Sequence, residues 1–140
     1  MEDKKLTPVR EHTQMVALEQ LQSDCHDNAL FHGFWDEYNQ LREMASKAGR
    51  LNLMDAIEHA TFAQKLMLTV SELAEAMEAD RLGDPLDSHC PEFTSREIEL
   101  ADVLIRVFDY SKFFKLRLGK AVIAKMKFNA SRPHMHGKKY

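Results

Sequence analysis

Apolar residues recur every three to four positions along most of this chain, and they rarely alternate strictly with polar residues. That spacing matches the 3.6 residues of a helical turn, whereas a half-buried strand would alternate. Only 5 glycines and 4 prolines interrupt the pattern in 140 residues. The pattern therefore predicts an all-α fold, a helical bundle of about five helices with a four-helix core.

Capping residues set the expected bounds of the first two helices. Thr7 is a typical N-cap, and Pro8 suits the first helical position because its missing N–H is not needed there. The first helix should run to about residues 24–30. Gly33 then breaks the pattern before a second helix at about residues 36–48.

The third predicted helix is the longest, at about residues 53–81, and the pattern is compatible with a break near residues 60–63. It ends at Gly83, and a loop containing Pro85 and Pro91 follows.

A capping-box pair, Thr94 and Glu97, opens a fourth helix that we expect at about residues 95–118. Gly119 should separate it from a last helix that ends near residue 131. The closing HMHGKKY is expected to be irregular.

Length and composition indicate one domain, residues 1–140, because a chain of this size builds a single sizeable core. No apolar run approaches the roughly 18 residues of a membrane span, and no apolar segment follows the charged start, so we expect a cytoplasmic protein without a membrane partner. Cys25 and Cys90 lie apart and form no CxxC motif. They therefore indicate neither a disulfide framework nor a structural zinc site.

Charge is distributed unevenly behind the formal net charge of −3. From Tyr110 to Tyr140 there are nine Lys and Arg and no Asp or Glu, which leaves 10 basic and 22 acidic residues in the first 109 positions. The basic end suits an anion, which can be nucleic acid, a phosphate-rich small molecule or the acidic remainder of the fold. Composition alone does not choose among these three.

Two pairs of acids, each spaced three residues apart, stand out on the third and fourth helices. Glu72 and Glu75 lie roughly opposite the apolar face of the third helix that we predict to be its core stripe. That stripe consists of Leu66, Val70, Leu73, Ala74 and Met77. On the fourth helix Glu99 and Asp102 form a narrow stripe with Arg106, and apolar residues surround the rest of the cylinder. Because a helix that is apolar all round is usually buried, we expect these acids to be buried too.

Buried carboxylates are costly unless they are paired or bind a metal. A single ExxE is usually solvated or neutralised by Lys or Arg, since Glu is a good helix former. Two such pairs on two apolar helices favour a metal site instead, and an all-oxygen cluster suits Mg²⁺, with Mn²⁺ as the alternative. Neither pair supplies the His of a ferritin-like di-iron site.

Three blocks of sequence resemble the MazG-like nucleotide pyrophosphohydrolases of the all-α NTP pyrophosphatase superfamily: ELAEAMEADR, EIELADVLIRVFDY and KMKFNASRPHMHGKKY. The mark of that family is ExxE followed by ExxD on the next helix, and here the blocks occur in that order between about residues 65 and 140. CHDNALFHGFWDE at 25–37 also looks like a family segment, but residues 38–65 intervene before the first acidic helix.

The resemblance implies magnesium-dependent hydrolysis of a nucleoside triphosphate to the monophosphate and pyrophosphate. Carried over by position, the metal ligands would be Glu72, Glu75, Glu99 and Asp102. A carboxylate that holds a water can also act as the general base, and we assign that catalytic role to Glu72 or Glu75.

The basic end offers groups for the phosphates. Lys125, Asn129 and Arg132 recur at helical spacing, so one face presents an ammonium, an amide and a guanidinium, which suit phosphate oxygens. The alternative is a solvated face. For the nucleobase we consider Trp35 and His32, with core packing as the alternative for the aromatic ring.

Apolar helices of this kind need more partners than one short chain supplies, so we expect a homodimer or homotetramer. Nucleic acid is not the expected partner. Three rivals remain open: a helical module that binds nucleic acid through the basic end, a related enzyme for a phosphoribosyl-ATP-type substrate, and a purely structural bundle.

Overall fold

The computed structural model describes residues 7–133, which form five helices and no strand. The helices are α1 (Pro8–Phe31), α2 (Asp36–Lys47), α3 (Leu51–Arg81), α4 (Ser95–Phe113) and α5 (Leu118–Ala130). The predicted all-α fold with about five helices is confirmed. The final HMHGKKY lies outside the described residues.

Both capping predictions are confirmed. The side chain of Thr7 accepts a hydrogen bond from the backbone N–H of Arg10, and Pro8 begins α1. At the start of α4 the Thr94 hydroxyl accepts from the N–H of Glu97, while the Glu97 carboxylate accepts from the N–H of Thr94. These bonds satisfy backbone donors that the first helical turn leaves unpaired.

Three predicted boundaries differ from the structure. α3 starts at Leu51 and is continuous, without a break near residues 60–63. α4 ends at Phe113, because Lys115 takes a left-handed conformation with φ of 55°. Gly119 lies inside α5, where a Cβ atom would come within 3.2 Å of the carbonyl oxygen of Met15. Gly119 therefore allows α5 to approach α1 closely and does not separate two helices.

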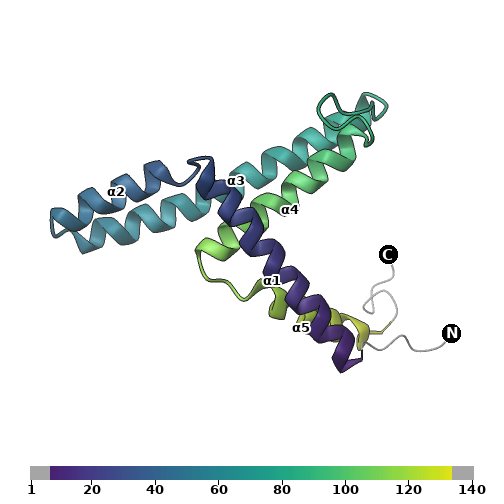
Figure 1. Cartoon of the computed structure of the whole chain (residues 1–140), viewed down its shortest axis with the longest axis horizontal. Coiled ribbons are helices and arrows are strands. Elements are labelled where there is room, and N and C mark those ends of the chain that lie inside the picture. Colours follow the sequence, from purple (N-terminus) through teal and green to yellow (C-terminus); the bar gives the residue numbers. More distant parts are fainter. Residues whose placement is uncertain (1–6, 134–140) are drawn as a thin grey trace.

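The helices pack in pairs that diverge from one central region (Figure 1). α2 lies along the N-terminal half of α3, and α4 returns antiparallel along its C-terminal half. α1 crosses the C-terminal part of α4, and α5 packs beside the N-terminal half of α1.

The core lies where the first four helices meet. Its most buried members are Ala29 on α1, Trp35 between α1 and α2, Tyr38 on α2 and Tyr110 on α4. Half-buried side chains complete it: Ile57, Phe62, Val107, Phe113 and Phe114. Helices α1 to α4 all contribute, as the predicted four-helix core requires.

The predicted core stripe of α3 is wrong. Its large members are 41–51% exposed, namely Leu66, Val70, Leu73 and Met77. The buried face of α3 instead consists of Thr69, Glu72, Ala76 and Ala79. Small residues on that face let the backbone of α4 approach closely, and this close packing turns the larger side chains outward.

Candidate metal centre

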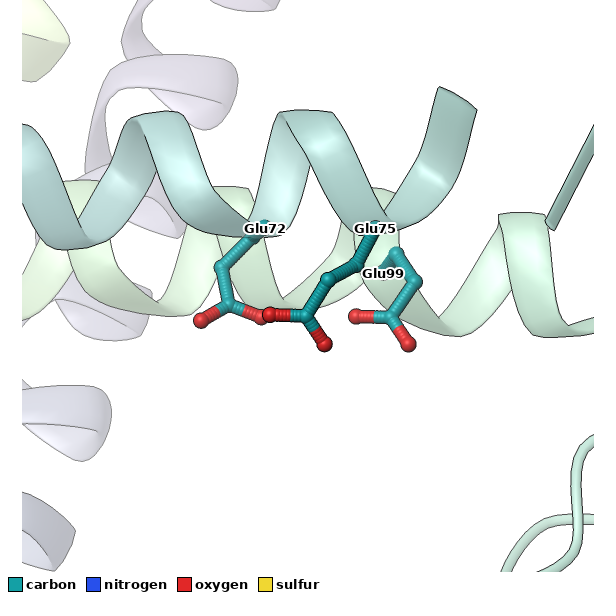
Figure 2. A group of neighbouring side chains, drawn as sticks. All are labelled: Glu72, Glu75 and Glu99. Carbon is teal, nitrogen blue, oxygen red and sulfur yellow. The ribbon is translucent and has the colours of Figure 1, made fainter. Parts of the chain in front are cut away.

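The antiparallel pairing of α3 with α4 brings three acids together. Glu72 and Glu75 on α3 and Glu99 on α4 each offer one carboxylate oxygen, and these oxygens lie within 4.8 Å of one another. Figure 2 shows the three carboxylates extending to the same side of the helix pair. Ligands from two helices that meet at one point are the arrangement expected of a cation site in a helical bundle.

The connection between the two helices fixes their register. Arg96 near the start of α4 binds Asp80 at 2.6 Å and Asp84 at 2.9 Å, so it ties the first turn of α4 to the end of α3. Within the loop, the Asp87 carboxylate accepts hydrogen bonds from the backbone N–H groups of His89 and Cys90. These bonds lower the pKa of Asp87. The acids of the cluster are thus placed by a connection that is itself well bonded.

Burial differs among the three glutamates. Glu72 is 6% exposed and faces α4, Glu99 is half-buried, and Glu75 is exposed. The cluster is therefore anchored on the buried side and open on the other, so that an ion and an attached ligand can reach it from solvent.

Electrostatic strain is present in the cluster. Burial raises the pKa of Glu99, and the charges of Glu75 and then Glu72 raise it further. The pKa of Asp102 is also raised, first by burial and then by Glu72, while Arg106 acts in the opposite direction. Like charges held close together disfavour ionisation, and a bound cation would relieve this effect.

Arg106 supplies the main positive charge beside the cluster. Its Nη2 lies 2.5 Å from Oε1 of Glu72 on α3, although Arg106 shares its stripe on α4 with Glu99 and Asp102. Its Nε is buried and makes no hydrogen bond within the described residues. One guanidinium beside four carboxylates leaves the site net negative.

Asp102, the fourth expected ligand, lies outside the group of three but close enough for its pKa to respond to Glu72. The structure thus brings Glu72, Glu75 and Glu99 together into a group that can hold a metal ion. The all-oxygen donor set fits a hard divalent cation.

The basic residues lie elsewhere in the chain. The C-terminal end of α5 presents one basic face around Phe128. The cationic groups of Lys125, on the helix, and Arg132, just beyond its C-cap, lie 4.8 and 5.7 Å from the centre of the Phe128 ring. Asn129 is exposed on the same helix. Because α5 packs on α1, this face lies on a different arm of the molecule from the glutamates (Figure 1).

Trp35 and His32 do not belong to the group formed by the three glutamates. Trp35 is 0% exposed, and its ring stacks on Phe113 with 3.8 Å between the centroids. Its position corresponds to core packing, the alternative considered for it. His32 is the exposed C-cap residue of α1 and contacts the ring of Phe31 edge to face.

One polar network was not found from the sequence. Asp109 is buried and accepts a 2.8 Å hydrogen bond from Trp35 Nε1, and its carboxylate lies 2.8 Å from His26 Nδ1. Lys65 lies 4.1 Å from the centre of the Trp35 ring and 4.0 Å from Asp109, and burial lowers its pKa. Asp109 lies seven residues after Asp102, which is about two helical turns, and nothing in this spacing indicates that its carboxylate bonds the core tryptophan.

No family model, curated protein or solved structure matches this chain. Within residues 7–133, none of the helices has the length and apolar character that a membrane span requires.

Proposed function

We propose that this protein is a magnesium-dependent nucleoside triphosphate pyrophosphohydrolase, which converts a (d)NTP and water to the (d)NMP and pyrophosphate. The observation that carries the proposal is the convergence of Glu72, Glu75 and Glu99 from two antiparallel helices. The order of the acidic and basic blocks along the chain, which resembles that of MazG-like enzymes, gives independent support.

The three glutamates would hold Mg²⁺, with Asp102 near enough to join them or to accept a hydrogen bond from a coordinated ligand. When bound, Mg²⁺ would screen the triphosphate charges and make water a better nucleophile. Mn²⁺ has the same preference for oxygen ligands and is the expected substitute.

Different surroundings suggest different roles for the two candidate catalytic residues. Glu72 is buried and paired with Arg106, so its carboxylate is fixed as a ligand. Glu75 is exposed on the open side of the cluster, where it can both bind and reach a water molecule. We therefore assign Glu75 as the group that orients the attacking water and accepts its proton.

The decisive experiment measures pyrophosphate release from the eight common NTPs and dNTPs, with Mg²⁺ and with EDTA. Wild type should release pyrophosphate only with Mg²⁺, and Glu75→Gln should lose at least 100-fold in rate, as is typical when a catalytic group is removed. Glu78→Gln is the matched control, because Glu78 is an exposed acid one turn further along α3 that pairs with Arg81. Equal rates for wild type and Glu75→Gln would refute the proposal.

The same assay separates the rivals. Turnover of phosphoribosyl-ATP alone would indicate the related enzyme. Binding of DNA or RNA that weakens steeply with salt, without turnover, would indicate a nucleic-acid-binding module. A structural bundle would show neither.

A further inference from the structure

Arg106 on α4 is only partly engaged by its partner Glu72. Its Nη2 contacts one oxygen of the Glu72 carboxylate, and this is the single ion pair that Arg106 makes within residues 7–133. A guanidinium carries five N–H donors in a planar fork, which often binds a carboxylate through two parallel hydrogen bonds. Most of the donors of Arg106 are therefore left for another acceptor.

The Nε–H group of Arg106 shows the same incomplete pairing. Nε is buried and has no acceptor in the described part of the chain. A buried donor without an acceptor costs free energy, so in folded proteins such donors usually have a partner. Arg106 is thus short of acceptors, whereas the carboxylates gathered beside it are short of cations.

Arg106 is also the member of the ion pair that solvent reaches. Its side chain is 40% exposed, whereas the Glu72 side chain is 7% exposed. Arg106 shares one face of α4 with Glu99 and Asp102, which precede it by seven and four residues. A ligand that enters the cluster from its open side, where Glu75 is exposed, therefore finds carboxylates and a partly exposed guanidinium together.

Other cations of the structure are placed for other tasks. Arg96 makes two ion pairs that fix the connection between α3 and α4. Lys65 lies over the ring of Trp35 in the core. The basic face of α5 lies on a different arm of the molecule (Figure 1). Among the described residues, Arg106 is thus the cation best placed to bind an anion at the glutamates.

Glu72 links Arg106 to the cation site, because one carboxylate serves both. If Glu72 also binds a divalent ion, it attracts Arg106 less strongly, and the guanidinium repels the ion. A phosphate group that contacts both the ion and Arg106 removes both penalties, since its oxygens are negatively charged and fit the guanidinium fork. Cation and phosphate then strengthen each other's binding, and this coupling is reciprocal because it is one free energy shared by two ligands.

We propose that Arg106 binds a phosphate group that arrives with the divalent cation, so that the glutamates take up the two together more readily than the cation alone. The ligand is an oligophosphate bound to a divalent cation, and inorganic pyrophosphate with Mg²⁺ is its simplest probe. That this phosphate belongs to a (d)NTP rests on the proposed function, whereas the coupling between cation and phosphate does not.

The first test measures the affinity for the cation alone. Mn²⁺ binding is followed by electron paramagnetic resonance without phosphate, for wild type and for Arg106→Met. The variant should bind Mn²⁺ about tenfold more tightly, which is the order of the repulsion between a divalent ion and a unit charge a few ångströms away in water. If Arg106 served only to hold Glu72 in place, its removal would weaken Mn²⁺ binding instead. Weaker or unchanged binding by Arg106→Met would overturn the proposal.

The second test measures the affinity for phosphate. Pyrophosphate is titrated into the protein in an excess of Mg²⁺, and the heat of binding is recorded. Arg106→Met should bind pyrophosphate at least about tenfold more weakly than wild type, because it lacks the charge-assisted hydrogen bonds of the guanidinium. Equal pyrophosphate affinities of wild type and variant would show that Arg106 does not contact the phosphate.

Two controls separate local charge from other effects of the substitution. Arg106→Lys keeps the positive charge, so its Mn²⁺ affinity should stay close to that of wild type, and affinity as high as that of Arg106→Met would contradict the role of charge. Arg81→Met removes the same charge from an exposed side chain of α3 that pairs with Glu78, and it should leave both affinities unchanged. Helical circular dichroism before each titration checks that each variant is folded.

The outcome for the coupling and the outcome for the proposed function are distinguishable. If Arg106→Met changes the two affinities in opposite directions but wild type hydrolyses no nucleotide, the proposed function fails and the coupling stands. If wild type hydrolyses nucleotides but both affinities fall together in Arg106→Met, Arg106 only positions Glu72, and the coupling fails.

Discussion

Replacing Glu99 with Gln should have opposite effects on stability without and with metal. The substitution keeps the size of the side chain and removes one negative charge from a group whose carboxylate oxygens lie within 4.8 Å of one another. At that separation two charges repel by about 0.9 kcal/mol at the dielectric constant of water and by up to about 3.5 kcal/mol at an effective value of 20. Since Glu75 is exposed and Arg106 neutralises part of the charge, we take about 1 kcal/mol as the gain without metal.

Magnesium should reverse the order. At a concentration 100 times its Kd, a ligand that binds only the folded state stabilises wild type by about 2.7 kcal/mol. If the loss of one ligand raises the Kd about 100-fold, the same concentration stabilises Glu99→Gln by only about 0.4 kcal/mol. Wild type should then be the more stable protein by about 1 kcal/mol, although it is the less stable one in EDTA.

Thermal unfolding with and without Mg²⁺ measures both effects. A difference of 1 kcal/mol corresponds to about 3 °C in Tm for a domain of this size. Glu99→Gln should therefore have the higher Tm in EDTA, and wild type should have the higher Tm in Mg²⁺. Glu58→Gln, on the part of α3 beside α2, is the control and should follow wild type in both conditions. A Glu99→Gln protein that is destabilised in EDTA, or that gains as much from Mg²⁺ as wild type does, would contradict the reasoning.

Three further predictions follow from the surroundings of the cluster and the core. Arg106→Met should destabilise by about 1–2 kcal/mol in urea unfolding, less than a fully buried pair because the arginine is 40% exposed, and adding Glu72→Gln should recover most of the loss. Asp109→Ala should cost about 2 kcal/mol, since it leaves the buried Trp35 N–H without its acceptor, and native Trp fluorescence should change with it. In the folded state the pKa of Asp102 is raised above its ordinary 3.8. As pH rises from about 4, the unfolded state therefore releases this proton first. The contribution of Asp102 to stability without metal then falls. Asp102→Asn should therefore make unfolding measured from pH 4 to 8 in EDTA less sensitive to pH.

The helices and the acidic group could be predicted from local features of the sequence. Thr7 with Pro8 and Thr94 with Glu97 fix two helix starts through bonds within one turn, and such short-range bonds can be read from spacing alone. The convergence of Glu72, Glu75 and Glu99 followed from two acidic pairs on consecutive helices, because elements that are consecutive in the chain usually pack beside each other. In both cases the decisive contacts lie close along the chain or follow from simple topology.

The faces of α3 could not be predicted in the same way. Periodicity identifies two faces of a helix but does not say which one packs against a neighbour in the same chain. Here the face with small residues, Ala76 and Ala79, meets α4, while Leu73 and Met77 remain about half exposed. The error came from taking the larger apolar side chains as the packing face, whereas the small side chains lie on the face that packs against α4.

This distinction bears on why the acids are tolerated. Glu72 is buried on the face that packs against α4, and Arg106 binds only one of the carboxylates gathered there. A group chosen for stability alone would replace such acids with apolar residues, since unpaired buried charge is costly. Arg106 is placed so that it partly offsets the repulsion and leaves the group net negative, as a cation site requires. The arrangement therefore fits a site whose carboxylates repel one another without metal and are neutralised by a divalent ion. The predicted reversal in stability between wild type and Glu99→Gln on adding Mg²⁺ measures that repulsion directly.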